Sequence, residues 1–138
     1  MNADGTDKRQ LQSSDQGIFR HPRSSPDSQR VSFFITGNGN PYINVMDAGG
    51  TNRRRLTSSE ETSRQASWDP DGNQLVYSKL TETFDLWGMN TNGTDALQLT
   101  SLPGDEAKPV FSPDGNLIVF VCFGCENENL SSLHVMSR

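Results

Sequence analysis

Three short motifs recur along this chain at almost constant spacing, and this repeat constrains the fold more than any other feature. Hexapeptides that begin with methionine and end in Gly-Thr start at residues 1, 46 and 89. Ser-Pro-Asp or Asp-Pro-Asp tripeptides start at residues 25, 69 and 112, and Leu-Gln or Leu-Thr pairs start at residues 11, 56 and 99. Each marker lies 43 to 45 residues after the previous one. Such self-similarity is typical of a repeated supersecondary unit.

Each repeat is expected to hold four short strands and no helix. Asp4-Gly5, Gly49-Gly50 and Asn92-Gly93 suit two-residue hairpin turns, because both central positions of such turns need positive φ. The Pro-Asp dipeptides mark a second turn in every unit. The segments between the turns, such as 31–35, 74–77 and 117–122, are rich in β-branched and aromatic residues without helical periodicity. A repeated four-stranded antiparallel unit of this length is typical of a β-propeller blade.

The combination of Ser-Pro-Asp-Gly, Met-Asn-x-x-Gly-Thr and Leu-Thr resembles the WD-repeat-like propeller repeats of the TolB family, over essentially the whole chain. One departure is Ser24, which stands where the family usually has tryptophan and where Trp68 and Phe111 stand in the other repeats. The resemblance implies a ring of six blades. It also implies a non-enzymatic role in binding protein partners, in the bacterial periplasm.

The predicted fold is an all-β propeller unit over residues 1–138, with three four-stranded antiparallel blades in permuted phase. The repeats cover about 1–45, 46–88 and 89–135, and the inner strands are expected near 19–23, 64–68 and 108–111. In this phase the strand of residues 7–12 is outermost, and the strand of residues 133–136 is a third strand without a partner. Propellers usually close with about four to eight blades, so three blades leave edges exposed.

We therefore expect two copies to form a six-bladed ring by strand exchange, each donating strand 7–12 to complete the other's blade at 133–136. A trimer of nine blades is a second possibility. A third is that the chain is a fragment of a longer propeller or a designed repeat protein with no evolved partner. The residues expected at the closure are Lys8, Gln10, Leu11, Leu133, Val135 and Met136.

Charged residues recur where the chain enters each inner strand, on the face that carries the longer loops. In a ring they would form alternating acidic and basic belts around the channel mouth, which suits a charged peptide or a small ligand. A solvated rim of weak ion pairs is the alternative interpretation. The candidate binding residues are Asp15, Arg20, His21, Glu60, Glu61, Arg64, Asp105, Glu106 and Lys108.

No catalytic residue and no cofactor are expected. The chain has two histidines and no Gly-x-Ser-x-Gly motif. Cys122 and Cys125 lack a second Cys or His pair at metal-ligand spacing, so the expected positions are the core for Cys122 and a loop for Cys125, without a metal site. A propeller that binds a small ligand or a glycan in its channel, or cleaves one as a lyase, remains the alternative function.

Charge and hydropathy limit the partners. The net charge of −5, from 17 acidic and 12 basic residues, argues against nucleic-acid binding. No apolar run approaches about 18 residues, so no membrane insertion is expected. The first residues carry no basic segment followed by an apolar stretch, and we therefore expect no signal peptide in this chain. Only 32% of residues are hydrophobic, which predicts a thin core.

Overall fold

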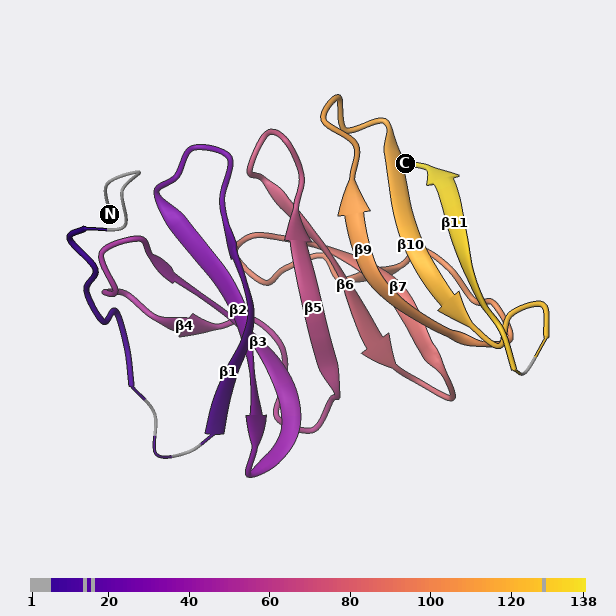
Figure 1. Ribbon diagram of the computed structural model, residues 1–138, viewed down its shortest axis with the longest axis horizontal. Coiled ribbons are helices and arrows are strands. Elements are labelled where there is room, and N and C mark those ends of the chain that lie inside the picture. The colour runs from indigo at the N-terminus through magenta and orange to yellow at the C-terminus, as the bar shows by residue number, and fades with distance from the viewer. Residues whose placement is uncertain (1–5, 14, 16, 128) are drawn as a thin grey trace.

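The computed structural model describes residues 6–13, 15, 17–127 and 129–138, and among these residues it contains three antiparallel sheets and no helix (Figure 1). No helix in this part of the chain is therefore available to cross a membrane. The first sheet is ordered β1-β2-β3-β4, the second β5-β6-β7-β8 and the third β11-β10-β9. The strands are β1 (Gly17–Ser24), β2 (Arg30–Gly37), β3 (Gly39–Asp47), β4 (Arg54–Arg55), β5 (Ser63–Trp68), β6 (Gln74–Leu80), β7 (Phe84–Asn90), β8 (Leu97–Gln98), β9 (Asp105–Phe111), β10 (Leu117–Phe123) and β11 (Ser131–Ser137).

The predicted all-β propeller architecture is confirmed, and the three sheets are its blades. They stand side by side like the leaves of a fan (Figure 1). The first and second blades have four strands, whereas the third has three among the described residues, with β11 at its edge. Residues 7–12 are not a strand in the single chain. An outermost strand needs a third strand to pair with, and the β3 edge of the first blade is already occupied by β4.

The hairpin turns have the geometry that their dipeptides favour. Gly50 and Gly93 both adopt a φ of 90°. At the Pro-Asp turns Gly72 and Gly115 have φ values of 73° and 74°, and Ser28 takes the same place in the first blade with a φ of 59°. A serine in this region is less favourable than a glycine, because its Cβ crowds the backbone. The backbone geometry of this turn is thus the same in all three blades, although the residue is serine in the first and glycine in the other two.

Side-chain hydrogen bonds tie the Pro-Asp turns. Ser25 Oγ donates to Asp27 Oδ1 and Ser112 Oγ donates to Asp114 Oδ1, both at 2.5 Å. The backbone N–H two residues after each aspartate donates to the same carboxylate. These hydrogen bonds hold the pKa of both carboxyl groups below the ordinary value of 3.8. In the second blade Asp69 replaces the serine, and its Oδ1 accepts from the backbone N–H of residues 73 and 74 at 2.8 and 2.9 Å.

The core lies between the blades. Strand β6 of the central blade is buried on both faces, because Leu75 and Tyr77 point towards the first blade while Val76 points towards the third. One cluster joins the first and second blades, and another joins the second and third. A third, smaller cluster of Phe33, Ile35 and Met46 lies on the far side of the first blade. Each blade therefore depends on a neighbouring sheet to bury its face.

Candidate functional site

The innermost strands β1, β5 and β9 share one irregularity. Strand β5 packs against both β1 and β9, so the three line the inner wall. Pairing with the second strand of each blade is interrupted by a bulge, and one residue in each bulge has positive φ. These residues are His21 (53°), Gln65 (60°) and Lys108 (56°). A bulge re-aims the side chain at its position, so the blades present one such residue each at equivalent places.

The prolines of the inner strands follow the bulges directly. Pro22 comes after His21, and Pro109 comes after Lys108. Neither proline belongs to the paired register, so the absence of a backbone N–H costs no ladder hydrogen bond. In the first and third blades the proline was the sequence signal available for the bulge. In the second blade Ala66 occupies the equivalent position after Gln65, so that signal is missing there.

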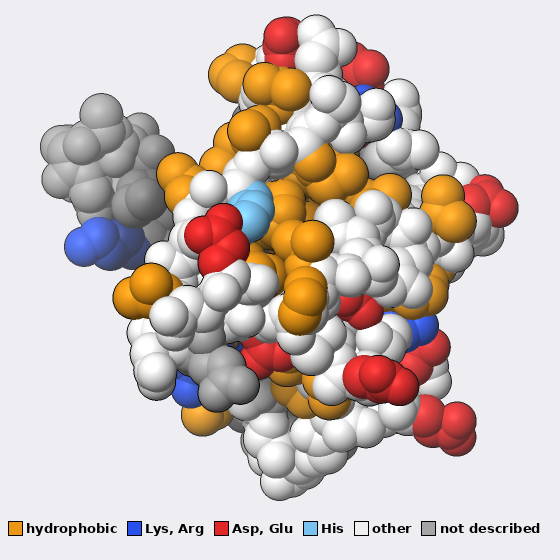
Figure 2. Space-filling view, turned by 90° about the vertical axis from the view of Figure 1, so that its right-hand side faces the viewer, with side chains coloured by type: hydrophobic (Ala, Val, Ile, Leu, Met, Phe, Trp, Pro, Cys, Tyr) orange, Lys and Arg blue, Asp and Glu red, His pale blue; other side chains and the backbone are white. Residues whose placement is uncertain are grey.

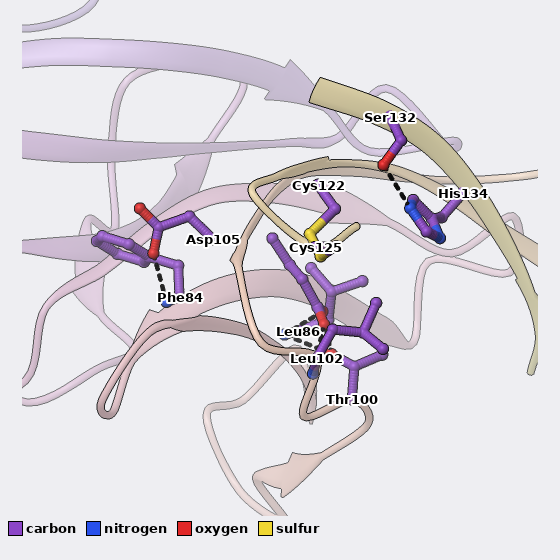
Figure 3. The surroundings of a disulfide bond; sticks show 10 residues. Phe84, Leu86, Thr100, Leu102, Asp105, Cys122, Cys125, Ser132 and His134 are labelled. Carbon is purple, nitrogen blue, oxygen red and sulfur yellow. Dashed lines mark hydrogen bonds between the residues drawn. A yellow bond between two sulfur atoms is a disulfide. The ribbon is translucent and has the colours of Figure 1, made fainter. Parts of the chain in front are cut away.

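Two predicted site residues meet between the second and third blades. The Arg64 guanidinium lies 3.5 Å from the centre of the Phe84 ring, and burial lowers the pKa of Arg64 while Asp105 opposes that shift. The Asp105 carboxylate accepts a hydrogen bond from the backbone N–H of Phe84 at 3.0 Å (Figure 3). Arg64 is therefore held against the first residue of β7.

Glu61 forms a local ion pair. Its carboxylate lies 2.8 Å from Lys79 Nζ, and the same ammonium group lies 4.2 Å from the centre of the Trp87 ring. The Glu61 side chain is 40% exposed, so solvent limits the strength of this pair. Asp15, Arg20 and Glu60 are exposed.

Glu106 is fully buried, unlike the other acidic candidates. Its Oε1 accepts from the backbone N–H of Leu102 at 3.1 Å, and its Oε2 accepts from the backbone N–H of Leu86 at 3.3 Å and from the Thr100 hydroxyl (Figure 3). Both carboxylate oxygens of Glu106 thus accept hydrogen bonds from within the chain. The carboxylate therefore ties the loop before β9 to β7, and a partner outside the protein does not reach it directly.

Cys122 lies in the core and Cys125 in the loop after β10, as expected, and the two form a disulfide, which the sequence reasoning had left open (Figure 3). Cys122 at the end of β10 is fully buried in the cluster between the second and third blades, and Cys125 packs against the same cluster. The backbone of the disulfide loop lies against Gly104, where an added Cβ would come within 2.3 Å of the Phe123 carbonyl oxygen. The Cys-x-x-Cys spacing was the sequence signal for this link.

His134 on β11 is a packing residue. Its ring stacks on Phe120 with centroids 5.4 Å apart, and its Nε2 lies 2.7 Å from Ser132 Oγ (Figure 3). Over the described part of the chain, no group of three or more His, Cys, Asp or Glu side chains is arranged to hold a metal ion.

The closure residues lie at the two ends of the fan. Leu133 and Val135 on β11 are 75% and 62% exposed, whereas Met136 packs inward against the third blade's cluster. Lys8 and Gln10 are exposed, and Leu11 is 36% exposed.

Comparison with known proteins agrees with this architecture. Putative TolB from Agrobacterium tumefaciens has a TM-score of 0.79 and 18% identity, over 92% of this chain and 47% of that one. TolB from Acinetobacter baumannii has a TM-score of 0.75 and 22% identity, over 92% of this chain and 31% of that one. The propeller domain of the Trilobed protease from Pyrococcus furiosus is described as having an open velcro topology. It has a TM-score of 0.63 and 14% identity, over 90% of this chain and 44% of that one.

The chain thus spans less than half the length of these three structures. At such identities the structural likeness shows the fold alone. The family model of the TolB beta propeller domain matches residues 2–137, nearly the whole chain. The chain therefore belongs to the TolB β-propeller domain family.

Proposed function

We propose that the chain is a non-enzymatic propeller scaffold that binds protein or peptide partners and completes its ring by exchanging strands with a second copy. The observation that carries the proposal is the position of residues 7–12. The proposal also places the chain in the periplasm, on the ground of its family membership. The charged groups on the loop-bearing face, among them Asp15, Arg20 and Glu60, are the proposed partner surface.

The segment 7–12 has the place of an outermost strand from a preceding blade. Leu56 follows β4 and packs on the hairpin turn of the next blade, where an added Cβ at Gly93 would lie 3.2 Å from the Leu56 carbonyl oxygen. Leu11 packs on the first blade's turn in the same way, since an added Cβ at Gly50 would lie 2.8 Å from the Leu11 carbonyl oxygen. Gln12 Nε2 also donates to the Gly50 carbonyl at 2.9 Å. The segment is thus held where the open edge of another copy could pair with it.

The third blade offers that open edge and an apolar face beside it. Figure 2 shows hydrophobic side chains gathered over this side of the molecule. Leu133 and Val135 of β11 alternate with inward-facing residues, and Val110 and Leu117 are 47% and 41% exposed. Exposed apolar groups gathered over one face are characteristic of an interaction surface.

The first blade carries a matching apolar surface at the opposite end of the fan. An apolar hollow of about 210 Å³ lies beside segment 7–12. It is lined by Leu11, Gln12, Phe19, Pro22, Val31, Phe33 and Met46. Within the chain, blades already pack face to face through such alternating apolar residues. Two copies arranged head to tail would repeat this packing twice and leave no open edge.

The test places charge on the exposed face of β11. The double variant Leu133→Asp and Val135→Asp should weaken association at least ten-fold, because two carboxylates would be desolvated in the interface. The matched control is Leu97→Asp, a residue that is 66% exposed on β8, away from both ends of the fan. Sedimentation velocity over a range of concentrations reports the association. A double variant that associates like the wild type would overturn the closure.

The non-enzymatic part has its own test. The chain is assayed against peptide, lactone and glycan substrates, and we expect no turnover above the buffer. Reproducible turnover that disappears when the protein is unfolded would overturn this part of the proposal and favour the channel-ligand or lyase alternative.

A further inference from the structure

A buried carboxylate in the second blade keeps one oxygen without a hydrogen-bond partner. The whole of Asp85, on β7, is only 3% exposed. Its Oδ2 accepts from the Thr81 hydroxyl at 2.6 Å and from Gln98 Nε2 at 3.0 Å. Its Oδ1 accepts no hydrogen bond from the residues that the structure describes, and this atom is not sealed off from solvent. Oδ1 is therefore free to accept from a ligand.

Asp85 lines a hollow of about 380 Å³ on the loop-bearing face. The hollow lies between the loop that joins β6 to β7 and the loop that enters β9. Glu82 and Gln98 contribute polar atoms to its lining, and Leu102 and Pro103 contribute apolar surface. Among the described residues, no lysine, arginine or histidine lines it. The hollow is the side from which a ligand reaches the carboxylate.

The cations of the neighbouring strands are engaged elsewhere. Lys79 is paired with Asp85 across β6 and β7, but its ammonium group lies 2.8 Å from the Glu61 carboxylate. Arg64 packs on Phe84, whose side chain leaves β7 on the opposite face from Asp85. Within the described ranges Asp85 thus has no ion pair of its own. A buried carboxylate without a counter-charge is costly, and a cation bound in the hollow would offset part of that cost.

The blade architecture does not require a carboxylate at this position. Tyr42 and Ser132 hold the equivalent places in the first and third blades, each four residues before the methionine of its repeat. The bonds to Thr81 and Gln98 tie the loop after β6 to β8, and an asparagine side chain could accept both of them. The fold therefore explains a polar side chain at Asp85 but not its negative charge.

The free acceptors of the hollow suit a primary ammonium group. Such a group donates three hydrogen bonds and accepts none. Asp85 Oδ1, the Glu82 carboxylate and Gln98 Oε1 accept no hydrogen bond from the described part of the chain. Leu102 and Pro103 offer apolar contact to the methylene stem of a lysine. A metal ion fits less well, because no three His, Cys, Asp or Glu side chains of the described residues are grouped to hold one.

We propose that the hollow beside Asp85 binds the lysine side chain of a peptide partner, with Asp85 and Glu82 as its anionic groups. Charge-assisted hydrogen bonds from the ammonium group to these carboxylates are of the strong kind. The inference rests on the proposed scaffold function and names the chemistry of one partner side chain. The hollow adjoins the central blade, away from both ends of the fan, so the site does not depend on ring closure.

The test is an NMR titration of the backbone and side-chain amides of the whole chain. The two ligands are acetylated, amidated Gly-Lys-Gly and the same peptide with an acetylated lysine side chain, which carries no charge. We expect the lysine peptide to shift the Gln98 side-chain amide and to bind at least ten-fold more tightly than the acetyllysine peptide. Asp85→Asn keeps an acceptor for Thr81 and Gln98 but removes the charge, so it should abolish that preference.

Two variants of exposed residues separate binding from folding. Glu82→Gln should reduce the preference at least three-fold, because Glu82 lines the hollow. The matched control is Asp71→Asn, the same charge change in the Pro-Asp turn at the opposite end of the blade, and it should change the affinity less than two-fold. Thermal unfolding checks that each variant is folded.

Three results would overturn the site: equal affinity for the two peptides, no binding of either, or a preference that Asp85→Asn and Glu82→Gln leave unchanged. None of them bears on ring closure, which sedimentation measures separately. A chain that stays monomeric but still prefers the lysine peptide would support the site and overturn only the ring.

Discussion

Replacing Glu106 with alanine should destabilise the fold strongly. The Leu102 N–H and the Thr100 hydroxyl would each lose the acceptor that the carboxylate provides, while the Leu86 N–H keeps Thr100 Oγ1 at 2.9 Å. An orphaned buried donor costs about 1–3 kcal/mol, and because these two donors belong to half-buried residues, their sum lies towards the lower end of about 2–6 kcal/mol. Removing the desolvated carboxylate offsets part of this. We expect a loss of about 3 kcal/mol in the free energy of unfolding. This is a large share of the total, because typical domains are stable by only about 5–15 kcal/mol.

Ser63 supplies the matched control. It lies five residues before Trp68, as Glu106 lies five before Phe111, and it is also fully buried. Its hydroxyl has no partner in the part of the chain that the structure covers. Ser63→Ala should therefore be neutral or stabilise the fold by up to about 1 kcal/mol. Glu106→Gln keeps one acceptor oxygen and should fall between the wild type and Glu106→Ala.

The assay is urea unfolding followed by tryptophan fluorescence, at one protein concentration for all variants, because association would shift the apparent stability. A Glu106→Ala variant within about 0.5 kcal/mol of the wild type would refute the reasoning, since such a difference is ordinary for a surface substitution. Equal destabilisation by Ser63→Ala would refute it as well.

Three further predictions concern stability. Gly104→Ala, whose Cβ would lie 2.3 Å from the Phe123 carbonyl oxygen, should cost about 1–3 kcal/mol, whereas Gly49→Ala enters open space and should be neutral by thermal unfolding. Reducing the disulfide, which spans a sequence separation of 3, should cost about 2 kcal/mol, and an unchanged melting temperature in dithiothreitol would contradict this. The lowered pKa values of Asp27 and Asp114 mean that their contribution is present above pH 3.8 and lost as the pH falls through the folded-state values, so Asp114→Asn should flatten an acid titration of stability.

The blade architecture could be predicted because its signals are local. Hairpin dipeptides and Pro-Asp turns specify where each strand ends. In the apolar run from Leu117 to Cys122, alternate residues such as Ile118 and Phe120 are buried against the second blade, whereas the other face of the strand lies on the open side of the third blade. The order of the strands follows from the phase of the repeat. These features depend little on contacts between distant residues.

Parts of the candidate site depend on tertiary contacts and could not be predicted in this way. The left-handed backbone of Gln65 and Lys108 comes from pairing between strands, and neither residue type signals positive φ. Glu106 was expected at the rim because a carboxylate usually stays in water, but one donor from β7 and two from the loop before β9 allow its burial. The position of Arg64 over Phe84 likewise needs the loop geometry of the second blade.

Ring closure by two copies is the central claim, and the mass of the folded wild-type protein in solution tests it most directly. Sedimentation equilibrium at micromolar concentration should give twice the chain mass of 15.3 kDa, with a single species that dissociates only at high dilution. A folded species of 15.3 kDa at every concentration would contradict the account.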